Sequence, residues 1–356
     1  MNWGILSTGV IARNFAETAR RMGDEVTLYA VASRSRESAD AFADQYGIPV
    51  RYASAEDLAC DPNVDIVYIG TPHSAHAEGM RCMIAHGKPV LCEKSFTTDA
   101  QQARKIFALA REKNVFVMEA FWTKLCPVYR EVERVLASGA IGEIRAVTAQ
   151  YGYNTAREAR KFDPQMAGGT LLDIGVYAIG FACMMLGYEF DSVQSNLVLN
   201  NAGTDAIDAI ILRKGNAVAS LTCAIGAQMP TMGAVYGSKG RIEIPEFKNP
   251  QRVTVCIDGK EPYTLSRPFE VNGFEYEIRE AMACVAAGKT QSSIVTPAQT
   301  IAVMEIRIRC ARRTDLSSRL KGKLYRLSSR PEEGLFRIIE YHARNRAASI
   351  DQLDFA

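Results

Sequence analysis

Three polar side chains in this sequence could together move a proton during the oxidation of an alcohol. Lys94 follows a short apolar run, and Asp173 and Tyr177 stand four residues apart in a second apolar segment that we expect to be one helix over residues 170–186. Residues four apart on a helix leave the same face, so Asp173 and Tyr177 can meet one ligand. Removing a hydride from a carbinol carbon also requires that the hydroxyl group lose its proton to a base.

Tyrosine can serve as this base when its pKa is lowered. The ordinary pKa is near 10, and a nearby ammonium favours the phenolate. We therefore expect Lys94 to lower the pKa of Tyr177 and to bind the substrate hydroxyl, Tyr177 to exchange the proton, and Asp173 to orient Lys94 and the substrate. The alternative is structural, because a tyrosine in an apolar helix is commonly half-buried core and a lysine is commonly at the surface.

A candidate dinucleotide-binding turn lies at the start of the chain. Residues 3–12 have the order strand, tight turn, helix start, which lets a pyrophosphate approach the backbone at the helix N-terminus. Gly9 is the strict match to the usual pattern, while Ser7 and Ala12 replace its first glycine and its last small position. The alternative is an ordinary turn between a buried strand and a helix. The expected cofactor contacts of this turn are Ser7, Thr8, Gly9, Val10 and Ile11.

The end of the second expected strand favours NADP over NAD. An NAD-specific site normally presents an acid here to the ribose 2′-hydroxyl, but the chain has Ser33 and Arg34, followed by Arg36. A guanidinium pairs with a 2′-phosphate through two parallel hydrogen bonds. The alternative is that both arginines are solvated residues at a helix start, and NAD stays open as the cofactor.

Three blocks of sequence resemble the glucose-fructose oxidoreductase and inositol dehydrogenase (Gfo/Idh/MocA) superfamily. They are residues 87–95, where the family's Glu-Lys-Pro reads Glu93-Lys94-Ser95, residues 71–76, and residues 168–177. Tyr177, Ser7 and residues 118–124 are similar to the dimeric dihydrodiol dehydrogenase branch, which also oxidises aldoses such as D-xylose, although the usual arginine of that branch is Lys124. The resemblance covers Asn2 to about Arg309.

The resemblance implies a fold, an activity and a set of site residues. The fold is an α/β Rossmann N-terminal domain plus an α+β C-terminal domain with a large, mostly antiparallel, open-faced sheet. The activity is hydride transfer between NADP(H) and a sugar, polyol or cyclic trans-diol, with Lys94, Asp173 and Tyr177 as catalytic residues. Further cofactor contacts are expected from Thr71, Pro72, His73, His76, Glu93, Lys94 and Trp122.

Other residues are expected to shape the substrate site. Trp122, Tyr151 and Phe274 correspond to aromatic walls in the dihydrodiol dehydrogenase branch, and a role in the core is the alternative for each. The polar residues Asn154 and Arg160, in the loop before Gly168, could fix substrate hydroxyls, and Gly168 and Gly169 would let a substrate or the nicotinamide pass close to the backbone. His73 and His76 could instead be ordinary first-turn histidines of a helix.

The elements needed to position these residues can be read from the pattern. Up to Glu119, Val- and Ile-rich runs alternate with amphipathic segments, as in βαβ units, and strand-like runs joined by short turns follow in the second half. Strands are expected at 2–6, 26–33, 66–70, 89–92, 115–118, 144–153, 193–199, 205–213, 217–224, 231–236 and 252–257. Helices are expected at 35–46, 74–86, 98–113, 128–138, 170–186, 274–287 and 296–313. We divide the chain into a nucleotide domain (1–122), a substrate and oligomerisation domain (123–313) and an extension of unknown role (314–356).

Composition sets limits on partners. The 356 residues carry a formal net charge of +2, which predicts no nucleic-acid or membrane partner. Nine scattered cysteines predict neither a disulfide framework nor a metal site and favour a cytoplasmic location. We expect no apolar stretch of about 18 residues, the length of a membrane span. An uncovered sheet face would favour a homodimer or homotetramer.

Two other functions of the same superfamily stay open at this stage. One is a glycosidase that oxidises a sugar on a tightly bound nicotinamide, eliminates its substituent and reduces it again. The other is a sensor that binds NADP without turnover. The presence of Lys94, Asp173 and Tyr177 together speaks against the sensor.

Overall fold

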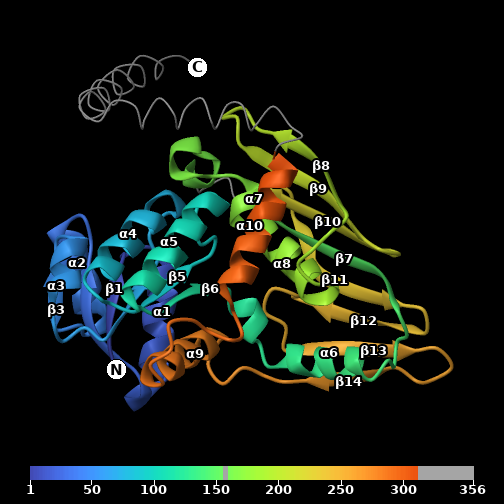
Figure 1. The fold of residues 1–356 in the computed structure, drawn as a ribbon, viewed down its shortest axis with the longest axis horizontal. Coiled ribbons are helices and arrows are strands. Elements are labelled where there is room, and N and C mark those ends of the chain that lie inside the picture. Colours follow the sequence, from blue (N-terminus) through green and yellow to red (C-terminus); the bar gives the residue numbers. More distant parts are fainter. Residues whose placement is uncertain (155–158, 312–356) are drawn as a thin grey trace, which may run out of the picture. The chain divides into compact units, whose positions relative to one another are not determined.

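The computed structural model describes residues 1–154 and 159–311, in which Met1–Cys310 form one compact unit. This unit contains two sheets, one of six strands and one of eight, with helices packed on them (Figure 1). The expected Rossmann domain and the mostly antiparallel sheet are therefore confirmed. The predicted extension 314–356 and the end of the last expected helix lie outside the described residues.

The first sheet is entirely parallel, in the order β3-β2-β1-β4-β5-β6. Its strands are β1 Asn2–Leu6, β2 Thr27–Ala32, β3 Val50–Tyr52, β4 Ile66–Ile69, β5 Val90–Glu93 and β6 Val117–Ala120. Its helices are α1 Val10–Arg21, α2 Arg36–Tyr46, α3 Ala55–Cys60, α4 His73–Ala85 and α5 Ala100–Lys113. The strand order reverses between β1 and β4, and ligands of open α/β sheets bind at this switch point. The sequence analysis missed β3 and α3, which are too short to show a clear period.

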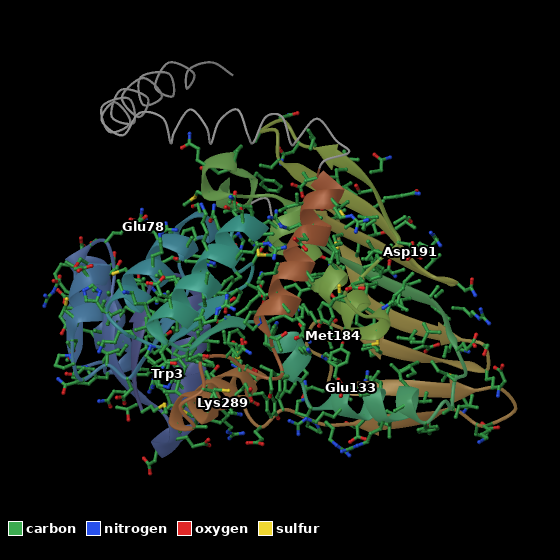
Figure 2. All side chains as sticks on the ribbon, in the orientation of Figure 1. Trp3, Glu78, Glu133, Met184, Asp191 and Lys289 are labelled. Carbon is green, nitrogen blue, oxygen red and sulfur yellow. The ribbon has the colours of Figure 1, made fainter. Side chains whose placement is uncertain are left out.

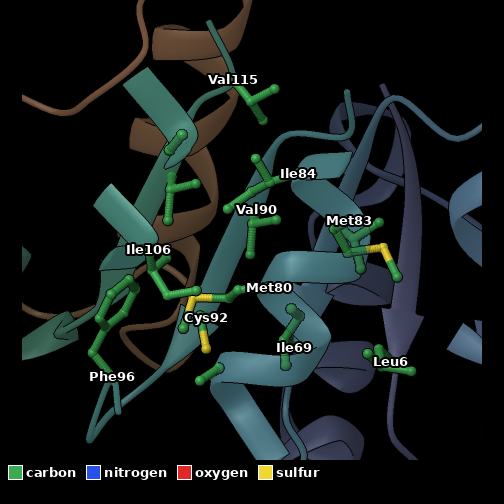
Figure 3. Close-up of a cluster of buried hydrophobic side chains, with 14 of the residues drawn as sticks. Leu6, Ile69, Met80, Met83, Ile84, Val90, Cys92, Phe96, Ile106 and Val115 are labelled. Atoms are coloured by element: carbon green, nitrogen blue, oxygen red, sulfur yellow. The ribbon is translucent and has the colours of Figure 1, made fainter. Parts of the chain in front are cut away.

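The core of this half lies between the sheet and its helices. Met80, Met83 and Ile84 of α4 pack on strand residues such as Ile69 and Val90 (Figure 3). A parallel sheet covered on both faces buries the side chains of its inner strands, which explains the continuous apolar runs of β4 and β5. The core thereby fixes the carboxyl ends of β4 and β5, where the site begins.

The second sheet has the order β14-β13-β12-β11-β7-β10-β9-β8, with one parallel pair, β7 and β10. Its strands are β7 Ile144–Tyr153, β8 Ser192–Leu199, β9 Asp205–Lys214, β10 Ala217–Ile225, β11 Met229–Gly237, β12 Gly240–Pro245, β13 Arg252–Ile257 and β14 Tyr263–Ser266. The accompanying helices are α6 Val128–Ala137, α7 Thr170–Asp173, α8 Gly175–Leu186, α9 Glu275–Ala286 and α10 Pro297–Ala311. The sequence analysis missed β12 and β14. Side chains fill the space between these elements (Figure 2).

The expected single helix over residues 170–186 is wrong, because the chain breaks at Ile174 into α7 and α8. The segment Pro164–Leu186 is nevertheless long and apolar enough by composition to cross a membrane, so the expectation that no such stretch exists is also wrong. In the structure 83% of its most apolar window is buried, and α8 packs on β7 and β10. This is the arrangement of a core helix that is apolar on all sides.

The other face of the second sheet carries partly exposed apolar side chains. Inward and outward residues alternate along β9, where Ile210 is buried and its neighbour Ile211 is 38% exposed. The larger exposed apolar residues of this face are Val198, Ile207, Ile211, Val218, Met232 and Tyr236. Contiguous exposed apolar surface of this kind commonly marks a contact with another molecule.

Candidate active site

The site begins where the two halves of the compact unit meet. Lys94 directly follows β5, and Asp173 ends α7. The Lys94 Nζ atom donates to the Asp173 backbone carbonyl at 2.8 Å and to its carboxylate Oδ1 at 3.1 Å. A residue at the end of the first sheet is thus bound to α7, which packs on β9 and β10 of the second sheet, and the pairing of Lys94 with Asp173 is the one that the sequence analysis expected.

Tyr177 lies beside this pair, one turn into α8. Its hydroxyl accepts a hydrogen bond from Trp122 Nε1 at 3.2 Å, and Lys94 Nζ lies 4.9 Å from the centroid of its ring. All of these side chains line one cleft of about 540 Å³. The full lining is Ile11, Asn14, Glu93, Lys94, Ala120, Trp122, Tyr151, Tyr153, Lys161, Asp173, Ile174, Tyr177, Lys248 and Phe274.

The protonation states differ in part from expectation. Burial raises the pKa of Tyr177 above its ordinary value, and the ammonium of Lys94 offsets only part of that increase. The expected net lowering of this pKa is therefore wrong, because the sequence does not reveal the depth of burial. Burial also disfavours the charged form of Asp173, but Lys94, His73 and Lys161 outweigh it and hold the Asp173 pKa below its ordinary range. At neutral pH the site contains a phenol and a carboxylate.

Glu93 forms the floor of the cleft. It is buried, it accepts a hydrogen bond from the Tyr68 hydroxyl at 2.7 Å, and it accepts another from the Lys94 backbone N–H at 3.2 Å. Burial raises the pKa of Glu93 to about 7, against the opposing effect of Lys94. Its charge consequently varies within the neutral range.

Ser95 stands where relatives have proline, and it is held by hydrogen bonds. The peptide bond between Lys94 and Ser95 is cis, and the Ser95 hydroxyl donates to the Leu172 carbonyl at 2.6 Å. Leu172 immediately precedes Asp173, so this bond fixes the two turns that present the ammonium and the carboxylate. The replacement of proline therefore leaves the turn connected to α7.

His76 lies between the turns that follow β4 and β5. It is buried, and its two ring nitrogens contact the carbonyl oxygens of Ser95 at 3.0 Å and Thr71 at 2.8 Å. Both ring nitrogens thus face protein carbonyls, and the expected cofactor contact of His76 stays a prediction. His73 begins α4 and stacks edge-on against His76 with 5.6 Å between ring centroids. Burial lowers the pKa of His73 to about 3, so it is neutral.

The two glycines before α7 make room for protein and not for a ligand. A Cβ atom on Gly168 would lie 2.5 Å from the Lys161 carbonyl oxygen, and one on Gly169 would lie 2.3 Å from the Asp205 carboxylate. Gly169 also has φ of +135°, a conformation that side chains rarely adopt. The expected passage for substrate or nicotinamide at this point is therefore wrong.

The turn between β1 and α1 fits a dinucleotide. Gly9 has no side chain to block the N-terminus of α1, no side chain caps that end, and Val10 is 68% exposed there. The buried Thr71 hydroxyl, after β4 in the same crevice, has no hydrogen-bond partner among the described residues. Uncapped N–H groups and an unpartnered hydroxyl at a switch point are what a bound pyrophosphate and ribose would satisfy. Ser7 has φ of 149°, where glycine is favoured, and its Oγ atom accepts from Gly9 N–H at 3.1 Å.

The two arginines that follow β2 differ in their surroundings. Arg34 is exposed, whereas Arg36 pairs with Asp40 of its own helix at 3.0 Å. Ser33 donates its backbone N–H to the Tyr52 carbonyl and keeps its side chain available. Arg34 is therefore the better candidate for a ribose 2′-phosphate.

The substrate side of the cleft contains the predicted aromatic walls. Trp122 and Phe274 lie with ring centroids 4.8 Å apart, and Tyr151 lies edge-on to Tyr177 at 6.3 Å. Asn154 is exposed and does not line the cleft, so its predicted contact is not seen. The side chain of Arg160 lies outside the described residues.

Of the cleft residues that the sequence analysis missed, three have a phenolic or charged side chain. They are Tyr153, whose hydroxyl donates to Asp173 Oδ2 at 2.9 Å, Lys161, which donates to that hydroxyl at 2.7 Å, and Lys248. Tyr153 ends β7 and lies on the same face as Tyr151, a signal that strand alternation offered. No sequence signal marked the two lysines, because both come from irregular segments.

One group of metal-ligand type lies away from the cleft, on α3 and α4. The Glu56 carboxylate is 3.1 Å from His86 Nε2, and the Cys82 thiol donates to the same carboxylate at 3.3 Å. The sequence analysis expected no such cluster because it missed α3. Burial and Glu56 raise the pKa of Cys82 to about 12, so the thiol stays protonated and the group is accounted for as a hydrogen-bonded cluster.

Comparison with known proteins decides the family. Residues 1–121 match the model of an oxidoreductase family with an NAD-binding Rossmann fold, and residues 129–243 match the GFO/IDH/MocA C-terminal domain. The chain belongs to the Gfo/Idh/MocA family. It is 36% identical over 310 residues to trans-1,2-dihydrobenzene-1,2-diol dehydrogenase of Xenopus laevis, covering 84% of this chain and 93% of that protein. The enzyme of the same name from Mus musculus is 33% identical over 314 residues, covering 86% and 94%.

Solved structures of the Gfo/Idh/MocA family agree with this fold. A 3-ketoreductase from Actinomadura kijaniata in complex with NADP and TDP-benzene has a TM-score of 0.80 at 26% identity, covering 88% of this chain and 97% of its own. An aldose-aldose oxidoreductase from Caulobacter crescentus complexed with glycerol has a TM-score of 0.79 at 22% identity, covering 88% and 98%, and shows the fold alone. This chain is accordingly an NAD(P)-dependent dehydrogenase or reductase acting on CH–OH groups.

Proposed function

We propose that this chain transfers hydride between NADP(H) and a carbinol or carbonyl carbon of a sugar, polyol or cyclic trans-diol. The observation that carries the proposal is the convergence of the Lys94 ammonium and the Tyr177 phenol in one cleft with the start of α1. The nicotinamide, when bound, supplies or accepts the hydride. The aromatic walls suit the apolar face of a ring, while the polar groups between them suit its hydroxyls.

The residues of the chain divide the proton chemistry among them. Tyr177 gives its proton to the carbonyl oxygen in reduction and accepts the hydroxyl proton in oxidation. Lys94 binds the same oxygen, and Asp173 holds Lys94 by two hydrogen bonds. Because the pKa of Tyr177 is raised, its side chain is a neutral phenol at neutral pH, which is the form that donates a proton in reduction. A substrate oxygen that carries developing negative charge would be stabilised by Lys94.

NADP is proposed as the preferred cofactor. Support comes from the exposed Arg34 beside Ser33 and from the absence of an acid at the end of β2. The reductase from Actinomadura kijaniata was solved with NADP, while a levoglucosan dehydrogenase of similar fold was solved with NADH. Arg34→Ala should therefore reduce kcat/KM for NADP about tenfold or more and leave NAD unaffected. Arg36→Ala, whose side chain pairs with Asp40, is the matched control.

The experiment that tests the function is a panel of aldoses, inositols and cyclic diols with NADP and NAD, and of the corresponding carbonyls with NADPH. We expect a change in the absorbance of the reduced nicotinamide with at least one of these classes. A cofactor retained through purification, with no net consumption of added NADPH, would instead support the glycosidase alternative. Tight NADP binding without turnover of any member would support the sensor alternative.

A further inference from the structure

The cleft holds more positive charge than hydride and proton transfer require. Lys94, Lys161 and Lys248 line it, against the two carboxyl groups of Glu93 and Asp173. Asp173 is shared, with its oxygens 3.1 Å from Lys94 Nζ and 3.8 Å from Lys161 Nζ. Since burial raises the pKa of Glu93 to about 7, Glu93 offsets this charge only in part near neutral pH.

Among the three lysines of the cleft, Lys248 has the positive charge that carboxylates of the protein neutralise least. Its ammonium donates to Asn249 Oδ1 at 3.0 Å and lies 5.7 Å from the Trp122 ring and 5.6 Å from the Tyr151 ring. Among residues 1–154 and 159–311, no carboxylate forms an ion pair with it. Burial lowers the pKa of Lys248, and Glu246 opposes this only in part. An anion from a ligand would relieve the cost of this desolvated charge.

The backbone fixes where this lysine lies. Lys248 follows β12, and its carbonyl oxygen accepts a hydrogen bond at 2.6 Å from the hydroxyl of Thr123, which is fully buried. The preceding carbonyl, that of Phe247, accepts from the buried Tyr129 hydroxyl. These two hydrogen bonds from buried side chains fix the backbone of residues 247 and 248, from which the Lys248 side chain lines the cleft. Lys248 thus lies in a part of the cleft lining whose backbone is held by buried side chains.

The distances relate Lys248 to the reacting end of the cleft. Trp122 donates through Nε1 to the Tyr177 hydroxyl, and the ring of the same tryptophan lies beside the Lys248 ammonium. The Trp122 indole therefore lies between the Tyr177 hydroxyl, which exchanges the proton, and the Lys248 ammonium.

We propose that the substrate carries a carboxylate besides the reacting alcohol or carbonyl, and that Lys248, with Lys161 nearby, binds it. The substrate class is then a polyhydroxy acid such as a uronic acid. This inference rests on the proposed function, whose site it specifies. A carboxylate is favoured over a phosphate because phosphate sites gather arginine forks or several backbone N–H groups, and no arginine lines the cleft within the described part of the chain.

The test compares three sugars that differ at one carbon: D-glucose, D-glucuronate and D-glucose 6-phosphate. Binding is measured by calorimetry on the full chain saturated with NADPH, a complex in which the uncharged aldose cannot be oxidised. We expect D-glucuronate to bind at least tenfold more tightly than D-glucose, with an advantage that shrinks as salt is added. Lys248→Gln should remove most of this difference, and Lys248→Arg should keep it. Lys260→Gln, at an exposed lysine of the turn after β13, is the matched control and should change nothing.

The outcomes separate this inference from the proposed function. Equal binding of D-glucuronate and D-glucose, failure of both to bind, or tighter binding of the phosphate would overturn the carboxylate site. If neutral sugars or diols are still oxidised with NADP in the turnover panel, the proposed function stands without the carboxylate site. If D-glucuronate binds in a Lys248-dependent manner but neither D-glucuronate nor any member of the panel is turned over, the anion site stands and the proposed function fails. Should Lys248→Gln lower the melting temperature, Lys161→Gln provides the second variant, with a smaller loss expected.

Discussion

Lys94 and Asp173 are joined twice, because one ammonium donates both to the backbone carbonyl and to the carboxylate of the same residue. The first bond fixes the position of α7 relative to β5, and the second fixes the orientation of the carboxylate. Two of the three N–H groups of Lys94 are used in this way. The remaining N–H group is available for the substrate oxygen. The Tyr177 ring lies beside it, with its centroid 4.9 Å from Nζ.

Tyr177→Phe removes the hydroxyl that exchanges the proton. We expect turnover to fall by about 10² to 10⁴, in line with general acid–base contributions, while NADPH affinity changes by less than about twofold. Stopped-flow turnover and fluorescence titration with NADPH measure the two quantities. Tyr151→Phe is the matched control, since this phenol lines the same cleft and keeps a pKa raised to about 12, and it should cost less than tenfold. An unaltered rate in Tyr177→Phe would remove Tyr177 from the mechanism.

Glu93 should make the protein less stable as the pH rises toward neutrality. Its pKa is raised from 4.5 to about 7, chiefly by burial, so the folded protein binds a proton that the unfolded chain has already lost. Folding is then coupled to proton uptake, and this contribution to the free energy of unfolding declines between pH 4.5 and about 7. In Glu93→Gln the decline should become shallower, by about 1 to 3 kcal/mol over the window.

Melting temperatures measured across this pH range check the prediction for Glu93. Glu17→Gln, at an exposed carboxylate on α1, is the control and should keep the slope of the parent protein. A steeper or unchanged slope in Glu93→Gln would mean that Glu93 is ionised throughout the range.

Much of the fold could be predicted from the sequence because the periods are long and regular. The bounds expected for β1 and β7 agree with the structure, and those for α2, α5 and α6 agree within two residues. The elements that were missed, such as β3 and α3, have three and six residues and show no period. The break at Ile174 was also missed, since an apolar segment gives no local signal where a helix is interrupted.

Many residues of the site could be predicted from the sequence, but the directions of their pKa shifts could not. The pairing of Lys94 with Asp173 followed from motif resemblance, whereas the sign of the Tyr177 pKa shift depends on burial, which a single sequence does not give. Lys248 escaped notice because its relation to Trp122 joins residues that are far apart in the chain. The contacts of His76 with the Ser95 and Thr71 carbonyls also escaped notice, because they join α4 to the turns that follow β4 and β5.

Ser7 provides a test of backbone strain at the nucleotide turn. Its φ of 149° is unfavourable for any residue with a side chain, and such strain costs on the order of 1–3 kcal/mol. Ser7→Gly relieves the strain and loses the bond from Gly9 N–H to Oγ, whereas Ser7→Ala loses the bond and keeps the strain. The glycine variant should therefore be more stable than the alanine variant by about 1 kcal/mol in urea unfolding. The reverse order would show that the turn relaxes elsewhere.

The outer face of the second sheet is predicted to join copies of this chain. Val218 and Tyr236 both pair with Ala146 of β7, so their partly exposed side chains stand in one row across three strands. Ile211 of β9 extends the same face. A lysine in this face would place a charge in the proposed interface, where its desolvation is unfavourable. We expect light scattering to give a dimer or tetramer for the parent protein and a smaller species for Ile211→Lys. Gln101→Lys, on the exposed side of α5, should leave the mass unchanged, and a monomeric parent protein would contradict the prediction.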